Sequence, residues 1–433
     1  QLTYIVNHAE DKVLFVDLTF VPLVEAVWNA LETVEILVIM TDSEHMPETK
    51  LPALCYEDLI TTEADVFEWP TFDENTASGL CYTSGTTGEP KGVLYSHRST
   101  VLHTLAMALP NVLAASDHET ILPVVPMFHV NAWGIPYVTS MTGMNLVMPG
   151  PGLDGASLTE ILNAEQVTIA AGVPTVWLGL LNHWREHNMS VPSLHTMVVG
   201  GSAPTRAMID AFEEDFGIHV LHAWGMTEMS PIGTACRLKP AMVNTTVEER
   251  RRVQLKQGRA VFGVEMKIVG HDGTELPQDG EEFGELNVRG PWICSSYFKM
   301  DESSAHDADG WFATGDIVTI DPDGYIDITD RSKDLIKSGG EWISSIELEN
   351  IASSHPDVAQ AAVIGVPNEQ WTERPLLIIV PKPDRQPTKE SVLAFFEDKV
   401  AKWCIPDDVV VVDALPIGAT GKVQKVKLRE QYA

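Results

Sequence analysis

The sequence predicts a large, multilayer α/β domain followed by a smaller α+β domain. Short apolar, β-branched runs alternate with helical patterns, as at 35–40, 196–201 and 218–225. This alternation favours α/β layers that bind ligands where the carboxyl ends of strands meet loops. The 433 residues, 44% hydrophobic and 21% charged, provide ample core for more than one domain. We place the domains at 1–331 and 332–433.

Charge and cysteine content narrow the class of function. The chain has 61 acidic and 29 basic side chains and a net charge of -32, which repels nucleic acid and anionic membranes. Its 5 cysteines are an odd number and have no C-x-x-C spacing. They predict reduced thiols in a cytoplasmic protein, with neither disulfides nor a zinc site. They are Cys55, Cys81, Cys236, Cys294 and Cys404.

One uncharged stretch, Thr120–Leu153, is long enough to span a bilayer. Its prolines and its polar residues argue against a membrane helix and favour buried strands and loops around an apolar cavity. The chain opens at Gln1 without Met or a signal peptide, within what reads as an interior strand and helix. We therefore expect that a sizeable N-terminal segment is missing.

The segment Tyr82–Val93, YTSGTTGEPKGV, predicts a phosphate-binding loop. Its glycines let backbone N–H groups turn toward an anion, its hydroxyls add donors, and Lys91 supplies a mobile ammonium. A solvated hairpin turn is the simpler alternative, and the density of donors disfavours it. Pro90 stands where a Walker A loop has glycine, which argues against a kinase or motor ATPase of that type.

Two further loops follow buried strands. Gly200 and Gly201 in GGSAP leave a backbone that can lie flat against a planar ring, although a plain βα turn has the same composition. In AWGMTEMSP, Trp224 can stack on a purine, Thr227 can donate to phosphate, and Glu228 offers a carboxylate suited to Mg²⁺. The alternative is that Thr227 caps a helix and Trp224 packs in the core.

These motifs, together with TGD at 314–316, DRSKD at 330–334 and a terminal GK at 421–422, occur in one order along nearly the whole chain. The chain resembles the adenylate-forming superfamily. Its HVNAWG and KSGGEWIS segments are similar to the medium-chain acyl-CoA ligase group, which includes 3-methylmercaptopropionyl-CoA ligase. Members of the family usually have Tyr where this chain has Trp224, and the change keeps an aromatic face while losing a hydroxyl.

The resemblance implies the adenylate-forming fold, with a small, mobile C-terminal domain, and a two-step reaction. An acid attacks the α-phosphate of ATP to give acyl-AMP and pyrophosphate, and CoA then displaces AMP. Asp316 resembles the carboxylate that binds the ribose hydroxyls, and Arg331 resembles its ribose and phosphate partner. Lys422 resembles the catalytic lysine of the first step. Lys333 occupies the hinge position, and rotation about it would replace Lys422 by the loop Lys337–Trp342.

The implied roles cover further residues. ATP and CoA contacts fall on Thr83, Ser84, Gly85, Thr86, Thr87, Gly88, Lys91, Gly201, Ser202, Ala203, Ala223, Trp224, Gly225, Met226, Thr227, Asp316, Ile328, Arg331, Lys337, Gly339 and Gly340. The Mg²⁺ ligands are Glu228 and Thr83, and the catalytic residues are Lys422, Thr227, Glu228 and His129. The segment from Ser96 to Arg98 either contacts CoA or caps a helix.

For the acid, His129 resembles the aromatic gate of the acyl tunnel, with Val130, Gly200 and Gly225 beside it. Trp133, one helical turn after His129, would fill the pocket and favour a short- to medium-chain acid, 3-methylmercaptopropionate included, because thioethers contact aromatic edges favourably. Simple core packing is the alternative for Trp133. The resemblance also favours a homodimer.

Two other functions stay open. One is an adenylating enzyme that passes the acyl group to another acceptor, such as the phosphopantetheine of a carrier protein. The other is a catalytically silent nucleotide-binding relative, which the presence of Lys422, Glu228 and Asp316 disfavours.

Overall fold

The computed structural model describes residues 1–83, 89–270, 272–300, 305–331, 334–338, 341–397, 399–417 and 423–433, and leaves aside the side chains of Arg331, Glu341 and Trp342. By internal packing the chain divides into two compact units. Unit 1 comprises Gln1–His97 and Tyr297–Asp301, and unit 2 comprises Arg98–Ser296 and Glu302–Ala433. The expected boundary between residues 331 and 332 stays a prediction.

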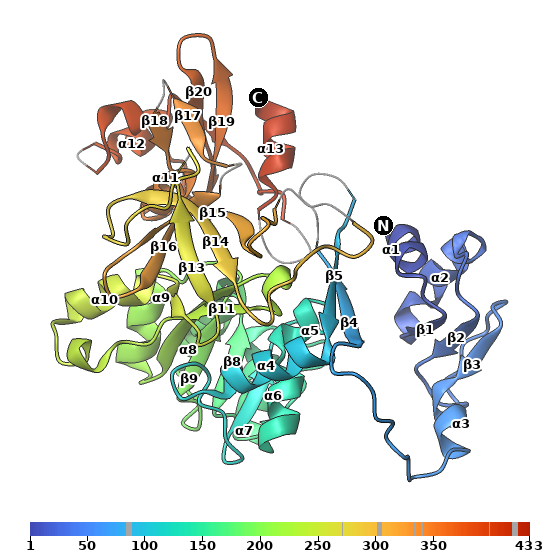
Figure 1. Cartoon of the computed structure of the whole chain (residues 1–433). Coiled ribbons are helices and arrows are strands. Elements are labelled where there is room, and N and C mark those ends of the chain that lie inside the picture. Colours follow the sequence, from blue (N-terminus) through green and yellow to red (C-terminus); the bar gives the residue numbers. More distant parts are fainter. Residues whose placement is uncertain are drawn as a thin grey trace. The chain divides into compact units, whose positions relative to one another are not determined.

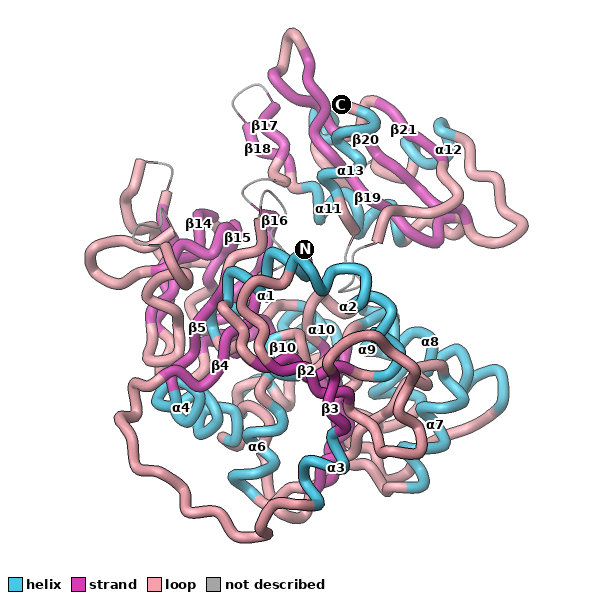
Figure 2. The backbone as a smooth tube through the Cα atoms, turned by 90° about the vertical axis from the view of Figure 1, so that its right-hand side faces the viewer, coloured by secondary structure: helices cyan, strands magenta, loops and turns pink. Residues whose placement is uncertain are grey.

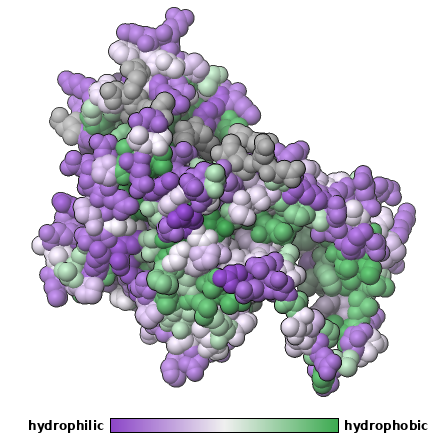
Figure 3. All heavy atoms as spheres, viewed as in Figure 1, coloured by the Kyte–Doolittle hydropathy of each residue, from purple (hydrophilic) through white to green (hydrophobic). Residues whose placement is uncertain are grey.

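Unit 1 holds a three-stranded parallel sheet of β1 (Val13–Val16), β2 (Ile36–Ile39) and β3 (Ala53–Cys55). Side chains alternate between the two faces. One face packs with α2 (Val21–Val27) into a buried cluster, and the other leaves Phe15 exposed. Figure 3 shows apolar surface over this unit. Its other elements are α1 (Leu2–Ala9), η1 (Leu18–Phe20), η2 (Trp28–Ala30), α3 (Tyr56–Thr61) and the antiparallel pair β4 (Ala77–Tyr82) and β5 (Gly92–Ser96).

Unit 2 is built on an 11-stranded sheet in the order β13-β14-β15-β16-β12-β11-β10-β9-β8-β6-β7. Figure 1 labels its strands β8, β9, β11 and β13 to β16. From β7 to β10 neighbouring strands are parallel, and from β10 to β13 they are antiparallel. The strands are β6 (Thr120–Pro123), β7 (Asn145–Leu146), β8 (Ile169–Gly172), β9 (Thr196–Val199), β10 (His219–Gly225), β11 (Ile232–Ala235), β12 (Gly258–Ala260), β13 (Glu265–Val269), β14 (Phe283–Arg289), β15 (Phe312–Ile320) and β16 (Tyr325–Arg331).

Helices cover the parallel part of this sheet, and one large buried cluster lies between them. Trp177 and Trp184 are fully buried there, and each satisfies its indole N–H, by donating to the Val198 carbonyl (3.3 Å) and to the Thr159 hydroxyl (2.9 Å) respectively. The helices of this part are α4 (His97–Ala108), α5 (Val130–Trp133), α6 (Ile135–Thr142), α7 (Gly155–Ala164), α8 (Pro174–His187), α9 (Arg206–Asp210), η3 (Ala211–Asp215), η4 (Thr227–Met229), η5 (Pro240–Met242) and α10 (Val247–Leu255).

The C-terminal part of unit 2 has its own sheet, in which β19 and β20 form a long antiparallel pair (Figure 2). Alternate residues face opposite sides: Val363 and Leu377 join one core cluster, and Ile364 and Ile378 join another. The elements are β17 (Ile336–Ser338), β18 (Glu341–Ile343), α11 (Ser345–Ser353), β19 (Val358–Asn368), β20 (Thr372–Pro381), α12 (Lys389–Ala394), η6 (Lys402–Cys404), β21 (Asp408–Val411) and α13 (Lys425–Tyr432). This confirms the predicted α+β pattern.

The uncharged stretch Thr120–Leu153 forms β6, α5, α6 and β7. None of the helices in the described part of the chain has the length and apolarity needed to cross a membrane. All five cysteines are free thiols.

Candidate functional site

The two glycine-containing loops of unit 2 follow neighbouring parallel strands. β9 and β10 pair in register from Thr196 with His219 onward, so GGSAP and GMTE emerge at the same edge of the sheet. Gly201 has a φ of 79°, a conformation that glycine adopts without steric cost. The loop then enters α9, where the Thr205 hydroxyl accepts a hydrogen bond from the Met208 N–H (3.3 Å).

The turn after β10 is fixed by a close backbone approach. A Cβ on Gly225 would lie 2.0 Å from the Pro231 carbonyl oxygen, so any side chain at this position would clash with the backbone. Thr227, half-buried, and Glu228, 6% exposed, stand in the short helix η4. The sequence predicts that both residues directly follow a strand. The structure places them there, after β10.

Glu228 is a buried carboxylate whose negative charge affects the pKa of a neighbouring thiol. Its carbonyl accepts a hydrogen bond from the Cys294 N–H (2.8 Å). Burial, and after it the negative charge of Glu228, raises the pKa of the Cys294 thiol to about 12. Cys294 thus stays protonated, although its Sγ is 3.6 Å from His306 Nε2, and we assign it no nucleophilic role.

Trp224 and Asp316 are in direct contact. The indole N–H of Trp224 donates to Asp316 Oδ2 at 3.1 Å, across 92 residues of sequence. Asp316 lies in β15 and is 2% exposed, and its Cα partner in β16 is Arg331. Ile328, also in β16, donates its N–H to Gln257 Oε1 (2.6 Å). The structure thus brings the AWGMTEMSP loop into contact with the TGD motif. The two motifs are far apart in the sequence.

Trp133 packs on Gly200. A Cβ at Gly200 would come within 2.9 Å of the Trp133 ring, so glycine allows the contact. The residues around Trp133 differ from the expected right-handed helical turn: Val130, Asn131, Ala132 and Trp133 have φ values of 45°, 56°, 48° and 59°. His129 precedes this left-handed turn and is half-buried. Trp133 therefore links the HVNAWG segment to the GGSAP loop.

In unit 1, Thr83 and Lys91 stand at the base of the β4–β5 hairpin, where the Thr83 N–H donates to the Lys91 carbonyl (2.9 Å). The Lys91 ammonium lies 4.8 Å from the centre of the Tyr297 ring. Ser84, Gly85, Thr86, Thr87 and Gly88 lie outside the described residues. Ser96 ends β5 and His97 begins α4, with its ring 4.6 Å from that of Phe72.

Of the predicted C-terminal site, Lys337 is described: it is exposed and lies in β17 opposite Trp342 in β18. The two ends of the expected loop Lys337–Trp342 therefore pair as antiparallel strands. Lys333, Gly339, Gly340 and Lys422 lie outside the described residues.

The helix α13, which follows Lys422, is held by two ion pairs. Lys425 contacts Glu349 at 2.7 Å, and Arg429 contacts Asp334 at 2.6 Å. Burial raises the pKa of Glu349, while the nearby Lys425 opposes the rise.

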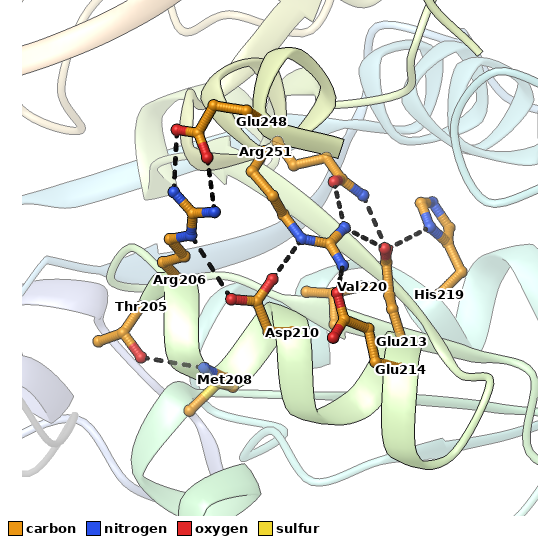
Figure 4. A network of polar contacts seen from close by, with 11 residues as sticks. Thr205, Arg206, Met208, Asp210, Glu213, Glu214, His219, Val220, Glu248 and Arg251 are labelled. Carbon is orange, nitrogen blue, oxygen red and sulfur yellow. Dashed lines mark hydrogen bonds and ion pairs between the residues drawn. The ribbon is translucent and has the colours of Figure 1, made fainter. Parts of the chain in front are cut away.

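A network of ion pairs centred on the buried Arg251 involves α9, the helix that follows the GGSAP loop (Figure 4). The Arg251 guanidinium, 5% exposed, contacts Asp210 at 2.6 Å and also pairs with Glu213, which His219 approaches at 3.2 Å. Burial raises the pKa of Glu213, but hydrogen bonds from His219 and Arg251 outweigh it, so the pKa lies below its ordinary value. The network joins α9 and η3 to α10 and to the start of β10.

Mg²⁺ bound with a nucleotide needs one or two carboxylates, because phosphate oxygens and water complete its coordination. Glu228 offers such a single, sheltered carboxylate, so the donor chemistry fits. Among the described residues no group of three or more His, Cys, Asp or Glu side chains is arranged to hold a metal by itself.

Sequence reasoning missed three features of the site: the Trp224–Asp316 bond, the Trp133–Gly200 contact and the left-handed turn. The first had a signal, because replacing Tyr by Trp also introduces an N–H donor. The other two depend on packing between distant segments.

Comparisons with known proteins identify the family of the chain. Residues 1–298 match the family model described as AMP-binding enzyme, and residues 347–422 match the AMP-binding enzyme C-terminal domain. The 3-methylmercaptopropionyl-CoA ligase of Ruegeria lacuscaerulensis is 53% identical over 433 residues, 100% of this chain and 80% of the relative. The medium-chain-fatty-acid–CoA ligase of Ectopseudomonas oleovorans is 51% identical over 100% of this chain and 79% of the relative.

Solved structures give the same result. The anthranilate CoA ligase AuaEII in complex with anthranoyl-AMP superposes with a TM-score of 0.85 at 26% identity, covering 99% of this chain and 80% of that one. ATP-bound MatB from Rhodopseudomonas palustris has a TM-score of 0.84 at 25% identity, over 100% of this chain and 81% of that one. The chain therefore belongs to the AMP-binding enzyme family, as an adenylate-forming acyl-CoA ligase that uses ATP to activate a carboxylic acid and forms its CoA thioester.

Proposed function

We propose that the acid is short to medium in length and that 3-methylmercaptopropionate is among the substrates. The observation that carries the proposal is the contact of Trp133 with Gly200, because a large aromatic side chain against this loop shortens the space for an acyl chain. Aromatic edges also favour thioether sulfur. The names of relatives at 51% to 53% identity support the same range of acids.

In the first half-reaction a carboxylate oxygen attacks the α-phosphorus and pyrophosphate leaves. Charge develops on the phosphate oxygens, so donors aimed at them lower the barrier. We assign this task to Lys422, to the Thr227 hydroxyl and to the phosphate loop from Thr83 to Lys91. Mg²⁺ held near Glu228, with Thr83 as a further candidate ligand, would supply further neutralisation of phosphate charge. Asp316 and Arg331 hold the ribose, and Gly201, Ser202, Ala203 and the segment Ala223–Met226 border the adenine.

In the second half-reaction the CoA thiol displaces AMP from the acyl carbonyl. We propose that the domain 332–433 turns about Lys333, withdraws Lys422 and presents the hairpin from Lys337, with Gly339 and Gly340 beside the pantetheine arm. His129 gates the acyl space, which Val130, Gly200 and Gly225 border, during adenylation. The homodimer and the cytoplasmic location expected from the sequence stay predictions.

A panel of acids tests the proposal. Acids of two to twelve carbons and 3-methylmercaptopropionate are incubated with ATP and Mg²⁺, with and without CoA, while pyrophosphate, AMP and thioester are measured. We expect the highest kcat/KM for short- and medium-chain acids and CoA-dependent turnover to AMP. A preference for long-chain acids would contradict the assigned acid. Pyrophosphate release without thioester formation would favour another acceptor, such as a carrier-protein phosphopantetheine.

A further inference from the structure

The indole of Trp224 carries a donor that its assumed stacking role does not use. Its N–H points to Asp316 Oδ2 at 3.1 Å, and Asp316 is 2% exposed. An indole N–H is a donor only, so the contact has one sense: tryptophan donates and the carboxylate accepts. Hydrogen bonds to an ionised acceptor are the stronger kind.

The ring is held in place by the next strand. A Cβ at Gly233 would lie 2.6 Å from Cζ3 and 2.8 Å from Cε3 of Trp224, and 2.7 Å from Cε of Met229. Gly233 lies in β11, and the Cα partner of Trp224 is the adjacent Thr234. The indole therefore rests on a strand without a side chain at that point, and its N–H direction is set by the sheet.

The carboxylate needs such a support. The torsion that turns an aspartate carboxylate is broad and has no sharp minimum, so its plane is set by its partners. A carboxylate has about four lone-pair sites on two oxygens. The Trp224 N–H on Oδ2 is a donor that helps to fix this plane. Neither Phe nor Tyr can place a donor at the position of the indole nitrogen.

We propose that Trp224 is a positioning residue for Asp316 and thereby sets how strongly the site discriminates a ribose from a deoxyribose nucleotide. The inference rests on the proposed function in one respect, the binding of ribose hydroxyls by Asp316. Trp224 acts through the carboxylate and touches neither reacting atom. Its effect therefore falls on ATP recognition and leaves the chemical step unchanged.

The experiment measures acid-dependent pyrophosphate release with ATP and with 2′-deoxy-ATP. The proteins are the wild type, Trp224→Phe, Asp316→Ala and Trp184→Phe. The last removes a buried indole N–H that donates to Thr159 and serves as the matched control. As a second variant with the ring shape kept, benzothienylalanine is incorporated at position 224, since it replaces the N–H by sulfur. Thermal midpoints are recorded for all proteins.

We expect Trp224→Phe and the benzothienyl variant to raise KM for ATP about tenfold, with kcat within about twofold, because a hydrogen bond to a charged group is lost. The ratio of kcat/KM for ATP over 2′-deoxy-ATP should fall about as much, and Trp184→Phe should keep it. An unchanged ratio in both 224 variants, with a reduced ratio in Asp316→Ala, overturns the role of Trp224 alone. An unchanged ratio in Asp316→Ala as well overturns ribose binding by Asp316, and the inference with it.

Discussion

At the scale of single residues, we propose that acid selection depends on the Trp133 side chain, which packs on Gly200. Replacing Trp133 by Ala removes the ring from the face of Gly200 and opens acyl space. Each additional methylene that is buried contributes about 0.8 kcal/mol, so two or three methylenes should shift the relative kcat/KM toward longer acids by one decade or more. The measurement is the kcat/KM profile over the acid series.

Gly200→Ala is the complementary variant, which changes the same contact from the side of the loop. The added methyl would lie 2.9 Å from the Trp133 ring, so the ring must move away from the loop and into the acyl space. We expect preference to shift toward shorter acids. If both variants keep the wild-type profile, Trp133 packs in the core, away from the substrate.

Two buried histidines predict loss of stability in mild acid. Burial lowers the pKa of His103 to about 3 and that of His222 to about 4, from 6.5. The unfolded chain binds these protons below pH 6.5 and the folded chain does not. Their stabilising contribution is therefore present above pH 6.5 and lost as pH falls toward the folded pKa values, by about 2 kcal/mol per histidine between pH 7.5 and 5.

His103→Gln tests this. The Ile232 N–H donates to His103 Nε2 at 3.2 Å, and the side-chain oxygen of glutamine can accept the same hydrogen bond. Urea unfolding at pH 7.5 and 5 should show a pH dependence about 2 kcal/mol smaller than in the wild type. His118→Gln, at a side chain that is 91% exposed, should leave the dependence unchanged. Equal pH dependence in the wild type and His103→Gln would mean that His103 titrates normally in the folded chain.

At the scale of elements, the buried Arg251 joins α10 to α9 and η3 through the half-buried carboxylates of Asp210 and Glu213. Removing one partner of a buried ion pair leaves the others desolvated without compensation, which costs about 3 to 5 kcal/mol. Arg251→Met should lower the free energy of unfolding by that amount in urea titrations, and the exposed Arg252→Met on the same helix should change it by less than about 0.5 kcal/mol. A similar small change in both variants would show that the network contributes little.

Elements with strong local signals were predictable. The apolar, β-branched runs at 35–40, 196–201 and 218–225 correspond to β2, β9 and β10. These agree because local pattern and tertiary environment favour the same structure.

The turn Val130–Trp133 was not predictable. Its composition is compatible with a right-handed helix, and positive φ costs non-glycine residues roughly 1 to 2 kcal/mol each. Ala132 is fully buried and Val130 is 3% exposed, so packing against the rest of unit 2 imposes the conformation. Likewise, the sequence shows that Trp224 carries an N–H donor, but no local pattern reveals that its acceptor is a carboxylate 92 residues away.

At the scale of the whole molecule, the chain must bind two anionic substrates, ATP and CoA, despite a net charge of -32. The negative electrostatic potential of the chain repels both substrates, so hydrogen-bond donors and cations at the site have to offset it locally. We assign this to separate groups: the phosphate loop with Lys91, the Thr227 hydroxyl in η4 after β10, and Lys422. Since Lys422 is the one cation of this set in the predicted C-terminal domain 332–433, we expect the two half-reactions to depend on it differently.

The most direct test of the account is Lys422→Ala assayed in each half-reaction. Pyrophosphate release from acid and ATP should fall by at least two to three decades, as for the loss of a group that stabilises transition-state charge. ATP binding should remain nearly intact, and thioester formation from synthetic acyl-AMP and CoA should continue at close to the wild-type rate. Equal loss of both half-reactions in a folded variant would contradict the assignment of Lys422 to adenylation alone, and unimpaired pyrophosphate release would contradict its catalytic role.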